Sequence, residues 1–219
     1  MPRLLFEKNG TAVWMSHLDL MRVFQRAFQR AGLPLTHTQG FNPRPSVSIA
    51  LPLSVGVESA CELLDFDLEG EKPGMEEIRD RLNVALVPGV TVRECYDTGR
   101  KIRDLSLLRV RLGLEYDGGI PAGTEDALLG LLTGPEILVE KKGKKGIQEQ
   151  DIRPMILEMQ LAKASGQELT LEALITCQNP SLNPALITAA IRKYLPSLVP
   201  DFVTYRREEI YDTDKTIFR

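Results

Sequence analysis

The chain has 219 residues, of which 43% are hydrophobic and 26% are charged, and its formal net charge is −3. This composition is typical of a folded protein with one large domain or two small ones, and it excludes a largely disordered chain. No apolar run reaches the roughly 20 residues of a membrane-spanning helix, and the N-terminus lacks the apolar core of a signal peptide. We therefore expect a cytoplasmic protein with no membrane contact.

Positive charge is concentrated in the first quarter of the chain. Residues 1–57 hold six basic residues and two acidic ones, a local excess of +4, and residues 58–80 are acidic. The basic residues are Arg3, Lys8, Arg22, Arg26, Arg30 and Arg44. A local basic surface steers an anion even on an acidic protein, so we expect a specific anion site rather than general polyanion binding.

The three cysteines Cys61, Cys95 and Cys177 lie far apart in the sequence, without a CxxC pair. A zinc site or an iron–sulfur cluster needs several thiolates close together, so we predict buried thiols instead. The sequence also lacks Walker A, GxGxxG, HExxH and GxSxG motifs in fitting contexts. We expect no metal and no cofactor in this chain.

The first elements in chain order are a strand, a turn and a long helix. Residues 2–8 alternate as in a strand, and the Asn-Gly pair after them predicts a hairpin with a returning strand at residues 11–15. A helix then begins after Ser16 and stops at Gly32. Apolar residues at three- and four-residue spacing give this helix one buried face. They are Leu18, Met21, Phe24, Phe28 and Ala31.

Strands and helices continue to alternate along the rest of the chain. In the first half the expected elements are strands at 46–53, 61–70 and 90–96 and a helix at 74–86. In the second half they are a strand at 105–117, a helix at 123–132, a hairpin at 136–152, two strands within 153–177, a helix at 183–195 and a strand at 201–212.

These elements predict an α+β fold of two ferredoxin-like (split βαβ) units, with mostly antiparallel sheets and helices packed on one face. The first domain, residues 1–99, carries the anion site. The second, residues 100–219, is an α+β domain that we interpret as a second ferredoxin-like unit. One fused α+β sheet is the alternative, and the two halves share no close sequence identity.

Polar residues gather near the start of the first helix. Asp19, Arg22, Arg26 and either Gln29 or Arg30 lie on neighbouring turns of one face. Asp19 can pair with Arg22. Ser16 and His17 lie at the helix N-terminus, where unbonded N–H groups and positive partial charge attract anions. The alternative is that this face of the helix is simply exposed to solvent and that Ser16 only caps the helix.

The loop Gly40–Pro45 adds a second group of candidate ligand-binding residues, and we expect it to fold together with the start of the first helix into a single positively lined pocket. Two prolines stiffen it, and Phe41, Asn42 and Arg44 offer a stacking surface, an amide and a guanidinium group. Rigid presentation lowers the entropy cost of binding a phosphate or carboxylate. The alternative interpretation is an ordinary surface turn.

Two further features favour nucleic-acid chemistry less strongly. Four lysines at the tip of the 136–152 hairpin can contact a phosphate backbone without reading sequence, or can simply be solvated. They are Lys141, Lys142, Lys144 and Lys145. His17 is a candidate general acid or base, and with His37 it could cleave RNA if both met at one site.

Asp151 and Arg153 are predicted to pair structurally at a strand start.

Three motifs carry a resemblance to a known family. The segment Ser16–Leu35, the segment Gly40–Ser59 and the DIRP sequence at residues 151–154 are similar to a bacterial family of uncharacterised radical-SAM-associated (radical-SAM-linked) proteins. The SHLD and GFNP sequences are specific as a pair, whereas that family often has another residue in place of Arg44. The resemblance implies a radical SAM protein as partner. This chain lacks the CxxxCxxC motif, so it cannot carry radical chemistry alone.

The residues and the resemblance together favour an accessory binding protein. We expect it to hold an anionic substrate, RNA above all, for a radical SAM partner enzyme. One alternative is a metal-independent RNA-cleaving or RNA-modifying enzyme that uses His17. Another is a protein–protein adaptor whose arginine face meets acidic residues of its partner.

Overall fold

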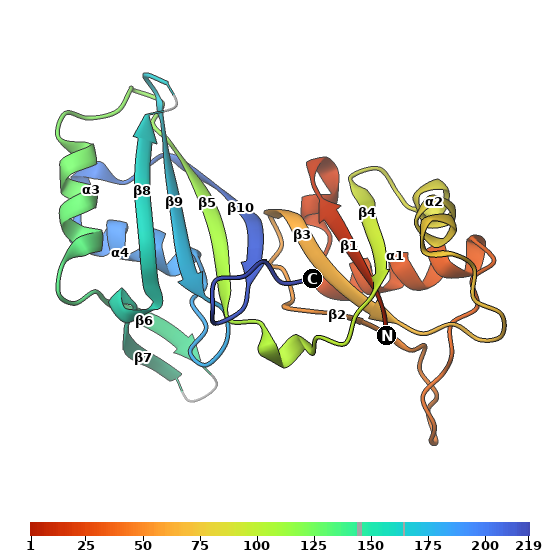
Figure 1. Ribbon diagram of the computed structural model, residues 1–219. Coiled ribbons are helices and arrows are strands. Elements are labelled where there is room, and N and C mark those ends of the chain that lie inside the picture. The colour runs from red at the N-terminus through yellow and green to blue at the C-terminus, as the bar shows by residue number, and fades with distance from the viewer. Residues whose placement is uncertain (144–145, 164) are drawn as a thin grey trace. The chain divides into compact units, whose positions relative to one another are not determined.

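The computed structural model describes residues 1–143, 146–163 and 165–219, and these form two compact units (Figure 1). Unit 1 consists of Met1–Asp104 together with Arg219, and unit 2 consists of Leu105–Phe218. The sequence predicted domains at 1–99 and 100–219.

Among the described residues of unit 1, four strands form an antiparallel sheet. In spatial order they are β4 (Val90–Asp97), β1 (Pro2–Lys8), β3 (Val57–Phe66) and β2 (Val47–Ile49). Helix α1 (His17–Arg30) lies in the connection from β1 to β2, and helix α2 (Met75–Ala85) lies in the connection from β3 to β4. A short 3₁₀ turn, η2 (Ile102–Asp104), follows β4.

Both helices of unit 1 cover the same face of the sheet. Leu4 and Phe6, two residues apart on β1, are fully buried and belong to one cluster with residues of α1 and α2. Phe24 and Phe28 come from α1, and the rings of Phe6 and Phe24 lie 4.7 Å apart in an edge-on arrangement. Alternate strand residues point to opposite faces, so this cluster fills the space between the helices and the sheet. The predicted apolar face of α1 is confirmed at Phe24 and Phe28, and Met21 and Ala31 pack against the cluster, but the prediction is wrong for Leu18, whose side chain is exposed.

The segment after β1 is a 3₁₀ turn, η1 (Gly10–Trp14), so the predicted hairpin and returning strand are wrong. Strand β1 pairs with β3 on one edge and with β4 on the other, and no edge remains for residues 11–15. The buried ammonium group of Lys8 also holds the turn, because it donates hydrogen bonds to the carbonyls of Val13 and Met15, each 3.1 Å away. The Asn-Gly pair therefore starts a turn that leads into α1.

Among the described residues of unit 2, four strands pair antiparallel with one another and two form a separate hairpin. The sheet order is β10 (Phe202–Tyr211), β5 (Leu107–Glu115), β9 (Glu168–Thr176) and β8 (Ile156–Lys163), and the hairpin consists of β6 (Leu138–Gly143) and β7 (Gly146–Asp151). The helices are α3 (Thr124–Thr133) and α4 (Ala185–Tyr194), and the 3₁₀ turns are η3 (Arg153–Met155) and η4 (Pro196–Leu198).

The two faces of strand β5 differ in character. Leu108, Val110 and Leu112 are buried in the core of unit 2. Between them Arg109 and Arg111 point to the opposite face, where the guanidinium group of Arg109 pairs with a carboxylate of β8 and that of Arg111 with a carboxylate of β10. Unit 2 therefore has one apolar face and one charged face on its sheet.

The same order of elements recurs in the two units. With the β6–β7 hairpin set aside, unit 2 repeats the sequence strand, helix, strand, strand, helix, strand, and in both units the spatial order is last, first, third, second. The predicted α+β class and the mostly antiparallel sheets are confirmed. The assignment of the units to the ferredoxin-like fold stays a prediction.

Candidate functional site

The first turn of α1 is closed by its own side chains. The backbone N–H of Asp19 donates to the hydroxyl of Ser16 at 3.2 Å, and that hydroxyl donates to the Asp19 carboxylate at 2.7 Å. The hydrogen bond from Ser16 lowers the pKa of Asp19, and the neighbouring guanidinium of Arg22 lowers it further. Asp19 is therefore ionised at neutral pH and places a negative charge at the positive end of the helix. The position at which an anion was predicted thus already holds a carboxylate.

His17 has no orienting partner in the part of the chain that the structure describes. It is half-buried, and its Nδ1 atom is shielded from solvent without a hydrogen bond. His37 is half-exposed, with Nδ1 3.9 Å from a carboxylate oxygen of Glu69. A general base is normally held by a partner that fixes its tautomer and orientation, and neither histidine shows a strong contact of this kind. The catalytic role of His17 stays a prediction.

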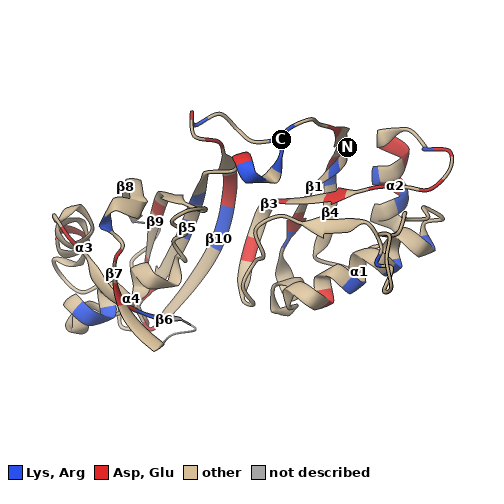
Figure 2. Cartoon of the chain, turned by 90° about the horizontal axis from the view of Figure 1, so that it is seen from below, with Lys and Arg blue, Asp and Glu red and all other residues tan. Residues whose placement is uncertain are grey.

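Three arginines follow one another at four-residue intervals along α1, and we call Arg22, Arg26 and Arg30 the arginine row. Residues four apart lie on adjacent turns, separated by a rise of about 6 Å along the axis. Arg22 pairs with Asp19 at 3.1 Å, and Arg30 donates to the carbonyl of Ala85 at 2.5 Å. Arg26 is exposed and has no hydrogen bond or ion pair to any described residue. Figure 2 shows basic residues along α1 beyond the acidic residue near its start.

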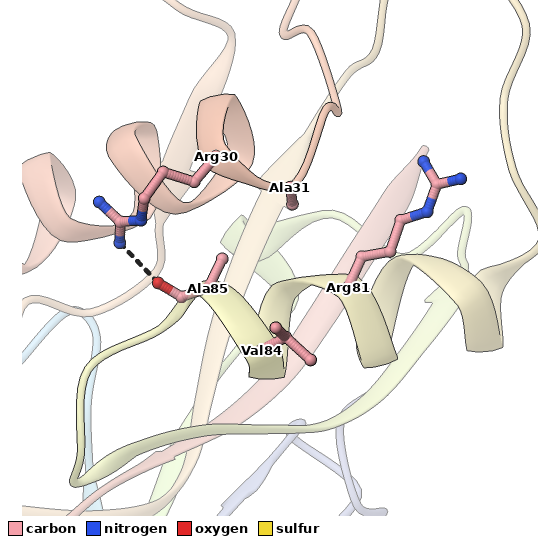
Figure 3. Close-up of a pocket in the computed structure, with 5 residues that line it drawn as sticks. All are labelled: Arg30, Ala31, Arg81, Val84 and Ala85. Carbon is pink, nitrogen blue, oxygen red and sulfur yellow. Dashed lines mark hydrogen bonds between the residues drawn. The ribbon is translucent and has the colours of Figure 1, made fainter.

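A shallow pocket lies between the C-terminal ends of α1 and α2, at the end of the arginine row (Figure 3). Its volume is about 380 Å³, and its lining consists of Arg30, Ala31, Arg81, Val84 and Ala85. Arg30 points toward Ala85, and Arg81 pairs with Glu77 of its own helix at 2.5 Å. Arg30 continues the spacing of the row, as one of the two alternatives that the sequence offered for this position. No sequence pattern pointed to Arg81, because the helix that carries it begins with acidic residues rather than with further basic ones.

Residues 36–46 form a narrow two-stranded loop, which we call the 36–46 arm. Its sides are joined by hydrogen bonds from Thr38 N–H to the Arg44 carbonyl at 2.8 Å and from Arg44 N–H to the Thr38 hydroxyl at 3.0 Å. Phe41 is fully exposed, and Asn42 next to it is exposed. The Arg44 side chain is exposed and has no partner among the described residues. Figure 1 shows the arm projecting from the body of unit 1.

The start of α1 and the 36–46 arm are separate features of unit 1. The arm begins shortly after the C-terminal end of α1, whereas Ser16 and His17 lie at the other end, a helix length of about 21 Å away. No hydrogen bond or ion pair among the described residues joins the arm to Ser16, His17 or Arg22. The start of α1 and the 36–46 arm therefore form two separate groups, and Ser16 and His17 of the first group are half-buried.

The basic hairpin tip is described only in part. Lys141 lies on β6 opposite Gln148 and is exposed, and the backbone of Lys142 belongs to the same strand. Lys144 and Lys145 lie outside the described residues. The contacts predicted for this tip stay predictions.

The DIRP sequence has a structural role. The Asp151 carboxylate accepts hydrogen bonds from the backbone N–H groups of Ile137 at 2.9 Å and Arg153 at 3.0 Å. The Arg153 side chain donates instead to the carbonyls of Gly134 and Ile156. Asp151 and Arg153 are therefore linked through the backbone, and together they fix the turn that enters β8.

The cysteines are buried as predicted at two of three positions. Cys61 and Cys177 are buried and Cys95 is half-buried. Burial raises the pKa of Cys95 to about 12 and that of Cys177 to about 11, so both stay protonated at neutral pH. Within the described ranges, no three His, Cys, Asp or Glu residues are grouped so as to hold a metal ion. No helix of the described part is long and apolar enough to span a membrane.

A family model matches most of the chain. It covers residues 2–184 and is described as "Uncharacterized protein conserved in bacteria (DUF2344)". The chain belongs to the DUF2344 family. No curated protein matches the sequence of this DUF2344 chain. Nothing in the family description refers to radical SAM chemistry, so the radical SAM partner stays a prediction from the resemblance.

Solved structures resemble the DUF2344 chain at very low sequence identity. A chain in "Crystal Structure of a Cbf5-Nop10-Gar1 Complex" has 10% identity and a TM-score of 0.52, with 95% of this chain and 48% of that chain covered. A chain in "Structure of H/ACA RNP bound to a substrate RNA containing 2'-deoxyuridine" has 8% identity and a TM-score of 0.48, with 94% and 46% covered. The DUF2344 chain thus spans about half the length of these chains, and the first likeness is one of fold alone.

Proposed function

We propose that this DUF2344 protein binds RNA through the arginine row of α1. The observation that carries the proposal is Arg26, which is exposed and without a partner among the described residues, between Arg22 and Arg30. A guanidinium group binds phosphate through paired N–H donors, and successive arginines along a helix can follow a polyphosphate backbone. The row has this geometry, because its members rise by about 6 Å from one to the next.

The 36–46 arm supplies a second contact in this proposal. Phe41 is fully exposed on the projecting loop, with Asn42 next to it and the Arg44 guanidinium exposed on the same loop. An aromatic ring, an amide and a cation are the groups that recognise unpaired bases and their backbone. The arm therefore provides stacking and hydrogen bonding where the row provides charge.

Binding without catalysis is the form of the proposal that the contacts support. His17 has no orienting partner among the described residues, and the acidic residue nearest in sequence, Asp19, is engaged by Ser16 and Arg22. The resemblance extends the proposal, since it implies that the bound RNA is presented to a radical SAM partner enzyme. That extension depends on the resemblance alone.

The test is the affinity of the purified protein for a fluorescently labelled single-stranded RNA, measured by anisotropy at low salt. The Arg22→Ala/Arg26→Ala variant should bind at least about tenfold more weakly, because two phosphate contacts are removed. Arg192→Ala is the matched control, since Arg192 is an exposed arginine in the last turn of α4 and has no ion pair to a described residue. Unchanged affinity in the double variant would refute the proposal, and so would an equal loss in the control.

A further inference from the structure

An exposed tryptophan lies at the junction between η1 and α1, outside every group of residues described so far. Trp14 is the only tryptophan of the chain and is 69% exposed. Leu18, four residues later in the first turn of α1, is 65% exposed, and Val55 is 53% exposed. Single exposed apolar residues are common on proteins, whereas several near one another mark a candidate binding surface.

The backbone around Trp14 is held rigidly although its side chain faces solvent. The buried Lys8 ammonium group donates to the carbonyls of Val13 and Met15, the two neighbours of Trp14, at 3.1 Å each. The Val13 carbonyl also accepts from Gly56 N–H at 2.8 Å. A Cβ atom added at Gly56 would lie 3.5 Å from Cζ3 of the indole, so the ring lies directly beside this glycine. A large aromatic ring is thus presented to solvent on a fixed support, which lowers the entropy cost of binding to it.

Leu18 continues the arginine row toward the N-terminus, because positions 18, 22, 26 and 30 of α1 are each separated by four residues and lie on one ridge. Trp14 is not part of this ridge: it ends η1, and Met15 and Ser16, which have extended backbone conformations, connect it to α1. The indole therefore lies two residues before the Ser16 cap, and the guanidinium groups begin at Arg22. Proteins that bind single-stranded nucleic acid combine these two components, an aromatic surface on which bases stack and a cationic track for the backbone.

We propose that Trp14 is a base-stacking platform and that the ligand of the arginine row is single-stranded RNA. This inference rests on the proposed function and specifies its substrate: an unpaired base stacks on the Trp14 indole while the adjoining phosphates reach Arg22 and Arg26. Positive charge at Arg22 and Arg26 favours a polyanion on this ridge over a partner protein with a purely apolar contact surface. Leu18 and Val55 border the stacked base.

The test uses the tryptophan fluorescence of the 219-residue protein, excited selectively over tyrosine, which reports on Trp14 because it is the only tryptophan. We expect a ten-nucleotide oligoadenylate to quench this fluorescence, because stacking brings the base against the indole. An abasic ribose-phosphate chain of the same length should bind through the arginines without comparable quenching. Equal quenching by both chains would overturn the inference, as would binding of oligoadenylate without any change in fluorescence.

Variants give an independent measurement of the same contact. Trp14→Ala should weaken oligoadenylate binding by about tenfold, within the range measured for loss of one stacking contact, and Trp14→Phe should weaken it less. The matched control is Phe202→Ala, because Phe202 is 56% exposed in unit 2. If Trp14→Ala binds normally while Arg22→Ala/Arg26→Ala does not, the stacking inference fails, the proposed function stands, and the Trp14 surface is assigned to protein contacts. If neither oligonucleotide binds the unmodified protein, both proposals fail.

Discussion

At the scale of single residues, the arginines of unit 1 serve opposite purposes. Arg3 is fully buried, and its guanidinium donates to both carboxylate oxygens of Asp65, at 2.6 and 3.1 Å, and to the carbonyl of Arg100 at 2.9 Å. Arg26, in contrast, is exposed and has no partner among the described residues. Both count equally in the net charge of the segment, but only the exposed one is accessible to a ligand.

Replacing Arg3 should therefore affect stability. In Arg3→Met the buried carboxylate of Asp65 loses its partner, and we expect the free energy of unfolding to fall by about 3–5 kcal/mol. Urea denaturation measures this change. Arg3→Met combined with Asp65→Asn should recover part of the loss, since no charge is then left buried. A single variant as stable as the original would show that the pair contributes little.

The buried thiols should be unreactive and should make stability depend on alkaline pH. Burial raises the pKa of Cys95 from its ordinary 9.0 to about 12 and that of Cys177 to about 11. The folded state thus favours the neutral thiol, so this contribution is fully present below pH 9 and is lost as the pH rises through about 11 to 12. We expect slow labelling of both by a thiol reagent at pH 8 until urea is added, and a melting temperature that declines above pH 9. Rapid labelling of the folded protein would contradict this.

At the scale of elements, helix α1 has an N-terminus that is capped by its own side chains and a side that carries a row of exposed arginines. Asp19 compensates the helix dipole and holds Arg22, and both effects reduce what the first turn can offer to an anion. The sequence placed the helix, its cap and its polar face correctly. It could not show that the carboxylate occupies the position at which an anion was expected.

Asp19→Asn should raise RNA affinity about two- to fivefold, because it removes a negative charge beside the arginine row and frees Arg22. The same change should lower the melting temperature slightly, since the carboxylate stabilises the helix start. Anisotropy titration and thermal melting measure the two effects. Asp80→Asn is the control, because Asp80 is an exposed aspartate of α2 that pairs with Arg79 at 2.8 Å; it should leave affinity unchanged.

The turn η1 depends on a close approach of backbone at Gly89. A Cβ atom at this position would lie 2.5 Å from the Asn9 carbonyl oxygen and 2.9 Å from Cβ of Ala12, and its φ is +84°. Gly89→Ala should therefore destabilise the protein by about 1–3 kcal/mol in a denaturant titration. Two causes contribute to this loss, the steric overlap with Asn9 and Ala12 and the strain of a positive φ. Gly70→Ala separates them, because Gly70 has a similar φ of +72° but open space around it. Equal losses at the two sites would exclude a steric contribution.

At the scale of the whole molecule, the net charge of −3 makes RNA binding a local property of unit 1. Binding through three arginines should give a slope of about −2 in a plot of log affinity against log salt concentration, the value for three phosphates on a single strand. Arg26→Ala should reduce this slope by about 0.7. Titrations between 50 and 200 mM salt, about the range in which such contacts weaken, provide the measurement. Affinity independent of salt would exclude phosphate contacts.

The sequence by itself determined the features that depend on neighbouring residues. The periodicity of α1, its Ser16 cap and the order of strands and helices follow from local spacing, and the structure confirms the α+β class that they predict. The single pocket expected from Ser16 to Arg44 required distances across the fold, and the structure shows two separate groups instead.

Only the tertiary structure decided which charged and aromatic residues reach the surface. Arg3 and Lys8 are buried and Trp14 is exposed because β1 is paired on both edges, which turns residues 10–14 into η1 instead of a strand. Strand pairing and burial depend on residues far apart in the chain, so no local pattern around Asn9 or Trp14 carries that information.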